Sequence, residues 1–235
     1  MTEKKENRMG VMPIGKLLFS MSTPMVISFL VQSLYNIVDS IFVARYSPDA
    51  LAAVSLAYPI QILMIAVSVG TGVGVNALLS RLLGEGKKDR AKVTADNAVL
   101  LAIAASIAFA IFGAIGTKAF FDAQTNNESI RSLGYSYLSI VSIFSFGLIL
   151  EVTYERILQS TGKTIYNMIT QGIGAIINII LDPILIFGLL GAPKLGVAGA
   201  AIATVTGQII AMILSFIFNM KYNEEVNISF GKHIF

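Results

Sequence analysis

The stretch IINIILDPILIFG, residues 176–188, decides the fold class of this 235-residue chain. Eleven of its thirteen side chains suit the interior of a lipid bilayer, whereas Asn178 and Asp182 are polar and Pro183 is a helix breaker. An ionised Asp in the middle of a membrane helix costs about 2.5–3.5 kcal/mol on insertion scales, so such residues usually face a cavity, pair or bind an ion. The stretch therefore predicts a membrane helix that carries a polar functional site.

The composition of the whole chain supports a membrane protein. Hydrophobic residues make up 55% and charged residues 13% of the sequence, and the mean hydropathy is +0.74; soluble domains carry about 25% charged residues. The chain has no cysteine, which excludes disulfides and thiolate metal sites. The pI is near 9.1, but Lys and Arg flank the apolar runs, a pattern that reflects membrane topology rather than nucleic-acid binding.

The apolar runs predict an all-α integral membrane fold with six transmembrane helices, because a helix of about 20 apolar residues spans the hydrocarbon. We place these helices at 15–44, 51–83, 92–116, 131–154, 163–190 and 195–220. The run 92–116 is the most uniformly apolar. We divide the chain into an N-terminal cytoplasmic tail (1–12), a six-helix membrane lobe (13–220) and the start of a cytoplasmic linker (221–235).

The basic residues predict the orientation of the lobe. Four basic residues fall on one side of the predicted membrane, namely Arg45, Lys118, Arg131 and Lys194. The other thirteen of the 17 fall on the opposite side, namely Lys4, Lys5, Arg8, Lys16, Arg81, Lys87, Lys88, Arg90, Lys92, Arg156, Lys163, Lys221 and Lys232. The positive-inside rule then puts both termini of a multi-pass plasma-membrane protein in the cytoplasm.

Polar residues recur at helical spacing in three of the predicted helices. They are Ser28, Gln32, Tyr35 and Asp39 in the first, with Asn36 beside them, Gln171, Asn178 and Asp182 in the fifth, and Thr204 and Gln208 in the sixth. Steps of three, four or seven residues place the members of each set on one helix face.

The three polar sets converge at one depth. At 1.5 Å per residue, Asp39 lies about 9 Å from Arg45 at the outer boundary, and Asp182 and Thr204 lie roughly 12 Å from the outer ends of their helices. Two carboxylates at matched depth suggest one shared site, provided that the first, fifth and sixth helices are neighbours.

Pro183 adds a second unusual feature to this site. It cannot donate a hydrogen bond to the carbonyl of Ile179, and its ring is expected to open the helix there. A freed carbonyl, an amide oxygen and a carboxylate form an oxygen cluster suited to Na⁺, or to hydrogen-bonding a protonated Asp. The break and the charge together predict a cation site.

Glu151 and Glu155 near the inner end of the fourth helix are weaker candidates. With Arg156 beside them, they are interpreted as an interfacial cluster whose charged ends reach water. The alternative is that Glu151 lines an inner vestibule.

The segment from Pro13 to Met220 resembles the N-terminal half of the multidrug and toxin extrusion (MATE) transporters. The resemblance is carried by TPMVISFLVQSLYNIVDSIFVA in the first helix, ALAAVSLAYPI, SRLLGEGKKDRA, NIILDPILIFG and GVAGAAIAT. It implies one of two six-helix lobes around a central cavity, in an exporter of amphipathic, often cationic drugs driven by Na⁺ or H⁺. It also implies a cation-coupling site at Asp39, Asn178, Asp182 and Thr204, with Tyr35 close by; Gln32, Tyr35, Asn36 and Gln208 are expected to line the cavity.

The length departs from this family pattern, because family members have about twice as many residues. We expect a fragment that needs its C-terminal lobe, or a half-size chain that pairs with a second copy. The expected protein is a transporter and not an enzyme, and it needs no cofactor beyond the coupling ion. Its expected partners are a small-molecule drug and membrane lipid.

Three alternatives remain at this point. A lipid-linked oligosaccharide flippase of the wider superfamily would carry basic residues in its cavity, and none lies in mid-span. An intramembrane aspartyl protease would need a G-x-G-D sequence around one membrane Asp, which the chain lacks. A non-catalytic membrane subunit would need no matched layer of polar residues.

Overall fold

The computed structural model describes residues 8–226, and every regular element in that part of the chain is helical. The elements are α1 (Arg8–Val11), α2 (Ile14–Tyr46), α3 (Pro48–Gly84), α4 (Lys88–Ile115), α5 (Thr117–Gln124), α6 (Glu128–Ile143), α7 (Phe146–Ser160), α8 (Thr164–Phe187), the 3₁₀ turn η1 (Leu189–Gly191) and α9 (Val197–Tyr222). Five helices are long and apolar enough to cross a membrane, and the bent pair α6–α7 makes a sixth span if taken as one. The chain is therefore an all-α membrane protein with a six-span lobe.

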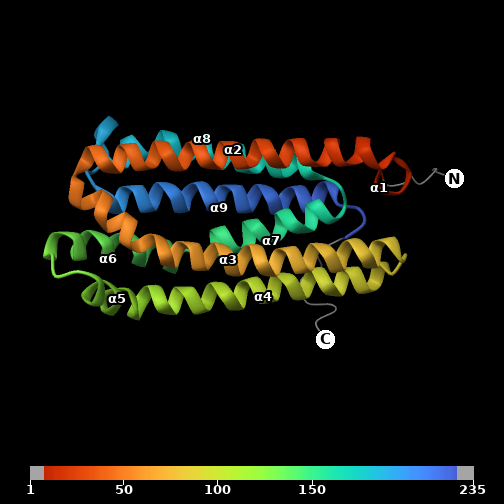
Figure 1. Ribbon diagram of the computed structural model, residues 1–235, viewed down its shortest axis with the longest axis horizontal. Coiled ribbons are helices and arrows are strands. Elements are labelled where there is room, and N and C mark those ends of the chain that lie inside the picture. Colours follow the sequence, from red (N-terminus) through yellow and green to blue (C-terminus); the bar gives the residue numbers. More distant parts are fainter. Residues whose placement is uncertain (1–7, 227–235) are drawn as a thin grey trace.

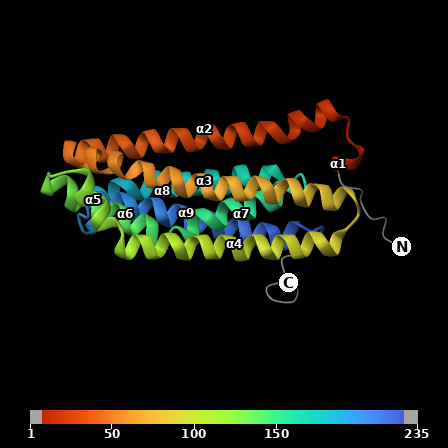
Figure 2. The same ribbon diagram turned by 60° about the horizontal axis from the view of Figure 1, so that its bottom comes forward.

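The long helices lie side by side in an elongated bundle (Figures 1 and 2). α2 packs on α8, α8 on α9 and α9 on α7, while α3 contacts α7, α4 and α6. The α3–α4 turn, the α7–α8 turn and the N-terminal end of α2 share one end of the bundle, and the α2–α3 and α8–α9 connections share the other (Figure 1). The condition for a shared site, that the first, fifth and sixth helices are neighbours, is thus met, since α2, α8 and α9 all contact one another.

The predicted fourth helix, 131–154, is wrong as a single element. The structure has two helices, α6 and α7, bent by 42° at Phe144 and Ser145. The N–H groups of Ser145 and Gly147 donate to carbonyls three residues back, Ser142 and Phe144. These shorter bonds tighten the chain and turn its axis without any proline. The prediction that 92–116 is the most apolar helix is confirmed, because α4 has the highest hydropathy of the candidate spans, 2.6.

The predicted opening of the helix at Pro183 is also wrong. α8 continues through Pro183 and ends at Phe187, where Gly188 adopts a left-handed conformation with φ 75°. Proline still lacks the N–H that would bond to the carbonyl of Ile179. Packing of α2 and α9 against α8 keeps the helix continuous despite that loss.

Small residues let α8 and α9 approach closely. A Cβ at Gly174 of α8 would lie 3.1 Å from the carbonyl oxygen of Gly207, and one at Gly199 of α9 would lie 2.6 Å from the carbonyl of Leu185. This crossing brings the polar faces of the two helices together. Along α9, the polar face lies between two apolar clusters, one reached by Val197 and the other by Phe216.

Candidate functional site

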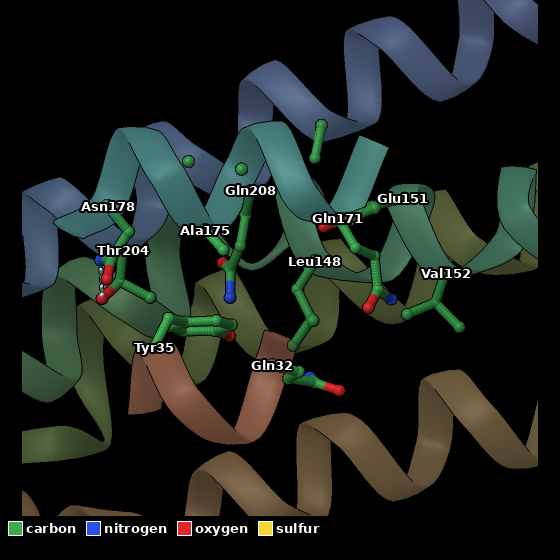
Figure 3. Close-up of a pocket in the computed structure, with 13 residues that line it drawn as sticks. Gln32, Tyr35, Leu148, Glu151, Val152, Gln171, Ala175, Asn178, Thr204 and Gln208 are labelled. Atoms are coloured by element: carbon green, nitrogen blue, oxygen red, sulfur yellow. Dashed lines mark hydrogen bonds between the residues drawn. The ribbon is translucent and has the colours of Figure 1, made fainter. Parts of the chain in front are cut away.

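Asn178 of α8 links the two helices that carry the predicted site. In the amide orientation that suits both neighbours, Nδ2 of Asn178 donates a hydrogen bond to Oδ2 of Asp182 at 3.2 Å. Its Oδ1 accepts hydrogen bonds from the hydroxyl and from the backbone N–H of Thr204, each at 3.2 Å. The contact with Thr204 is drawn in Figure 3. Asn178 is 2% exposed and Asp182 is fully buried, so the lobe solvates these groups in place of water.

The carboxyl group of Asp182 also lies next to that of Asp39 on α2, and the two groups interact electrostatically. Two ionised carboxylates side by side in a buried site repel each other, and a proton or another cation relieves that repulsion. One oxygen of Asp39, Oδ1, is buried and has no hydrogen-bond partner among the described residues. The structure therefore brings together Asp39, Asn178, Asp182 and Thr204, which the sequence selected as one site.

A pocket opens next to this cluster, between α2, α7, α8 and α9 (Figure 3). Its cavity volume is about 50 Å³, more than the roughly 10–15 Å³ needed for one water. Its lining residues are Gln32, Tyr35, Leu148, Glu151, Val152, Gln171, Gly174, Ala175, Asn178, Thr204, Gly207, Gln208 and Ala211. Three of the four expected cavity residues, Gln32, Tyr35 and Gln208, are in this lining.

Asn36, the fourth expected cavity residue, does not line this pocket. It lies next to Tyr35 on α2, but its side chain is exposed on the surface of the lobe. Residues adjacent in a helix point about 100° apart, so Asn36 and Tyr35 cannot both face α8.

The interfacial reading of Glu151 and Glu155 is wrong. The two side chains are only 7% and 4% exposed, and Glu151 lines the pocket. Both face α8, where Thr170 and Gln171 donate to Glu155 at 3.2 and 3.1 Å. The spacing of four residues places both carboxyl groups on one helix face. Periodicity could have identified that face, but the sequence could not show that α8 covers it.

The donor set suits a small cation. Among residues 8–226, no group of three or more His, Cys, Asp or Glu side chains is placed to hold a metal ion. Two carboxyl groups, one amide and one hydroxyl instead offer oxygen atoms that can bind a proton or a small cation.

A sequence model of the MatE family matches residues 24–184, which is well over half of the chain. The chain belongs to the MatE family. It is 34% identical over 203 residues to a protein named FAD transporter from Shewanella oneidensis, covering 86% of this chain and 45% of that protein. It is 28% identical over 222 residues to the multidrug export protein MepA of Staphylococcus aureus, covering 92% of this chain and 48% of that protein.

The fold agrees with solved MATE structures. A crystal structure of MATE in complex with MaL6 matches 94% of this chain at a TM-score of 0.87 and 27% identity, and the match covers 48% of that chain. The chain thus spans about half the length of the MatE relatives that it matches.

Proposed function

We propose that this chain forms the N-terminal lobe of a cation-coupled antiporter that exports amphipathic, often cationic organic compounds across the plasma membrane. The observation that carries the proposal is the meeting of Asp39 and Asp182, from separate helices, beside a pocket between those helices. Buried acids in a membrane lobe are costly and typically mark ion pathways.

The coupling follows from the charge of this acid pair. When Asp39 and Asp182 are both ionised and empty, their repulsion and poor solvation favour an arrangement of the lobe that separates them or exposes them to water. A cation that neutralises them favours the arrangement described, in which the carboxyl groups touch. An ion can bias the lobe only through its different affinities for the two states.

The contacts that Asn178 makes with Asp182 and Thr204 favour H⁺ over Na⁺ in this arrangement. A Na⁺ ion between Asp39 and Asp182 would have both carboxylate oxygens turned toward it and would need further oxygen ligands. Asn178 already commits its amide oxygen to Thr204. Na⁺ binding would therefore require Asn178 to change partners.

The pocket lining favours cationic or neutral substrates. It contains Glu151, three glutamines and Tyr35, with no Lys or Arg. FAD carries a negatively charged diphosphate, which the acidic Glu151 in this lining would repel and no basic residue would pair with. The lining therefore does not favour FAD, the compound in the name of the Shewanella oneidensis relative. The same lining speaks against a flippase for lipid-linked oligosaccharides, because their diphosphate also calls for basic residues.

Export by alternating access requires a second lobe to move against this one, supplied by further sequence or by a second copy. We place both termini of this lobe on the cytoplasmic side. The bundle end that carries the α3–α4 and α7–α8 turns holds many of its basic residues, including Arg81, Lys88 and Lys163 (Figure 1).

Transport in the full-length antiporter tests this function. Asp39→Asn and Asp182→Asn, made separately, are expected to abolish efflux of a fluorescent organic cation from vesicles driven by a pH or Na⁺ gradient. Asp89→Asn is the matched control, because Asp89 is an exposed acid at the start of α4. Gradient-driven efflux at the wild-type rate in both site variants would overturn the proposal, and running the two gradients separately identifies the ion.

A further inference from the structure

A second pair of buried acids lies outside the Asp39–Asp182 cluster. Glu151 and Glu155 occupy successive turns of α7, and their charges interact. Gln171, whose side chain reaches this pair, precedes Asp182 by eleven residues on α8, which corresponds to about 16 Å along the helix. Glu155 lies on the side of Glu151 nearer the α7–α8 turn, so the second pair is closer to the end of the bundle that we place in the cytoplasm.

The two carboxyl groups have different surroundings. Glu155 accepts hydrogen bonds from Thr170 and Gln171, whereas the carboxyl group of Glu151 accepts none from any described residue. Neither carboxyl group forms an ion pair within 4 Å with a described residue. The lobe thus buries two neighbouring acids with no bound positive charge between them.

Two side chains that contact Glu155 carry unpartnered oxygens. The side-chain oxygens of Gln171 and Asn167 are buried and accept no hydrogen bond from a described residue. Asn167 is 2% exposed and donates to the backbone carbonyl of Glu155 at 3.0 Å, and Gln171 donates to its carboxylate. Buried acceptors without donors carry a free-energy cost unless a proton or cation is supplied.

The charged or titratable groups nearby do not supply a compensating positive charge or proton to Glu151 and Glu155. Arg156 interacts with Glu155 without an ion pair within 4 Å; its Nη1 donates to Gln159 at 2.7 Å, and its buried Nε has no hydrogen-bond partner among the described residues. Tyr35 of α2 faces Glu151 and is also near Asp39 and Asp182. Tyr35 therefore lies between the two acid pairs and carries no positive charge.

We propose that Glu151 and Glu155 bind one monovalent cation, H⁺ or Na⁺, at a second site separate from Asp39 and Asp182. Two adjacent buried carboxylates cannot both remain ionised at low cost, and one cation removes the repulsion. The oxygens of Gln171 and Thr170 complete the site. Its presence does not depend on the proposed antiport.

Its place in transport does rest on the proposed function. A coupling ion that enters from the outer side and leaves the Asp39–Asp182 pair must travel toward the cytoplasm. The pocket lies between the two pairs, since it is lined by Asn178, which bonds to Asp182, and by Glu151 of the second pair. In this scheme, the second site binds the ion on its way from the Asp39–Asp182 pair to the cytoplasm.

Infrared difference spectroscopy of the purified full-length antiporter tests the site directly. The parent is the Asp39→Asn/Asp182→Asn variant, in which the first site is disabled. Lowering the pH without Na⁺ should produce a protonated-carboxyl band if the ligand is H⁺, and adding Na⁺ at fixed pH should shift a carboxylate band if it is Na⁺. Adding Glu151→Gln should remove that change.

The controls separate the site from general damage. Glu151→Gln removes no hydrogen bond, so it is expected to fold, and Glu151→Asp should restore the signal in part. Glu85→Gln is the matched control, because Glu85 is an exposed glutamate in the α3–α4 loop, where Lys87 and Arg81 lower its pKa to about 2. Parent spectra that stay unchanged on adding Glu151→Gln and, separately, Glu155→Gln would overturn the proposal. Wild-type transport by the parent would instead overturn the antiport scheme alone.

Discussion

Gly207 of α9 lies in backbone contact with Gly174 of α8: a Cβ at Gly207 would be 2.7 Å from the carbonyl oxygen of Gly174. The same Cβ would be 3.6 Å from the Cβ of Asn178, so this contact sets the spacing of the polar site. Gly207→Ala is expected to push the helices apart and to destabilise the lobe by about 1–3 kcal/mol, as overpacking does. Thermal unfolding of the purified full-length antiporter measures this loss.

Gly172→Ala is the control for that substitution. Gly172 is also within α8, but a Cβ there would meet nothing within 4 Å. Alanine favours a helix over glycine by about 0.5–1 kcal/mol, so this variant should melt at the same temperature or higher. Equal destabilisation by both substitutions would contradict the role given to the Gly174–Gly207 contact.

Thr204 offers a test of the hydrogen bonds around Asn178. Thr204→Val keeps the shape of the side chain and removes the hydroxyl that bonds to Asn178 at 3.2 Å. Loss of one such bond costs about 0.5–1.5 kcal/mol, so the apparent affinity for the coupling ion should fall roughly 2- to 10-fold. The measurement is the ion dependence of efflux in vesicles.

Two further variants show whether that effect is local. Thr206→Val removes a hydroxyl that bonds to the carbonyl of Ile202 within α9 and does not line the pocket, and it should leave the ion dependence unchanged. Thr204→Ser restores the hydroxyl and should recover most of the affinity. A weakened ion dependence in Thr206→Val alone would refute the assignment.

Helical spacing was sufficient to predict that Asp39, Asn178, Asp182 and Thr204 lie close together. Apolar surroundings make each polar residue conspicuous in a membrane helix, and the fixed rise per residue converts sequence position into depth. The predicted opening of the helix at Pro183 was wrong because the prediction treated the helix alone. In the structure, packing of α2 and α9 against α8 keeps the helix continuous through Pro183.

Features that depend on tertiary contacts could not be predicted from the sequence. The bend at Ser145 involves no proline and arises from short-range backbone bonds where Gly147 packs against Ile209 of α9. The burial of Glu151 and Glu155 depends on which helix covers their face of α7. Charged residues near the end of a predicted span look the same in sequence whether they reach water or meet another helix.

The pocket can be filled without replacing Asp39 or Asp182. Ala175 of α8 lines it and is 4% exposed. Ala175→Leu adds three carbons to a space of about 50 Å³ and should slow efflux of a bulky organic cation more than it weakens ion binding, because Asp39 and Asp182 remain in place. Ile176→Leu, on the exposed side of the next position, should leave both unchanged. Equal loss of efflux and ion binding in Ala175→Leu would argue against a separate substrate pocket.

The C-terminal end of α9 is fastened to the α7–α8 turn. The ammonium group of Lys163 donates to the backbone carbonyl of Tyr222, and the rings of Tyr222 and Tyr166 stack with centroids 4.7 Å apart. Burial lowers the pKa of Lys163. Tyr166→Ala is expected to remove the stack and raise amide hydrogen exchange over 219–226 several-fold, without affecting the distant Asp39–Asp182 pair. Tyr58→Ala, at an exposed tyrosine of α3, is the control; unchanged exchange at 219–226 in Tyr166→Ala would show that the stack does not hold this end.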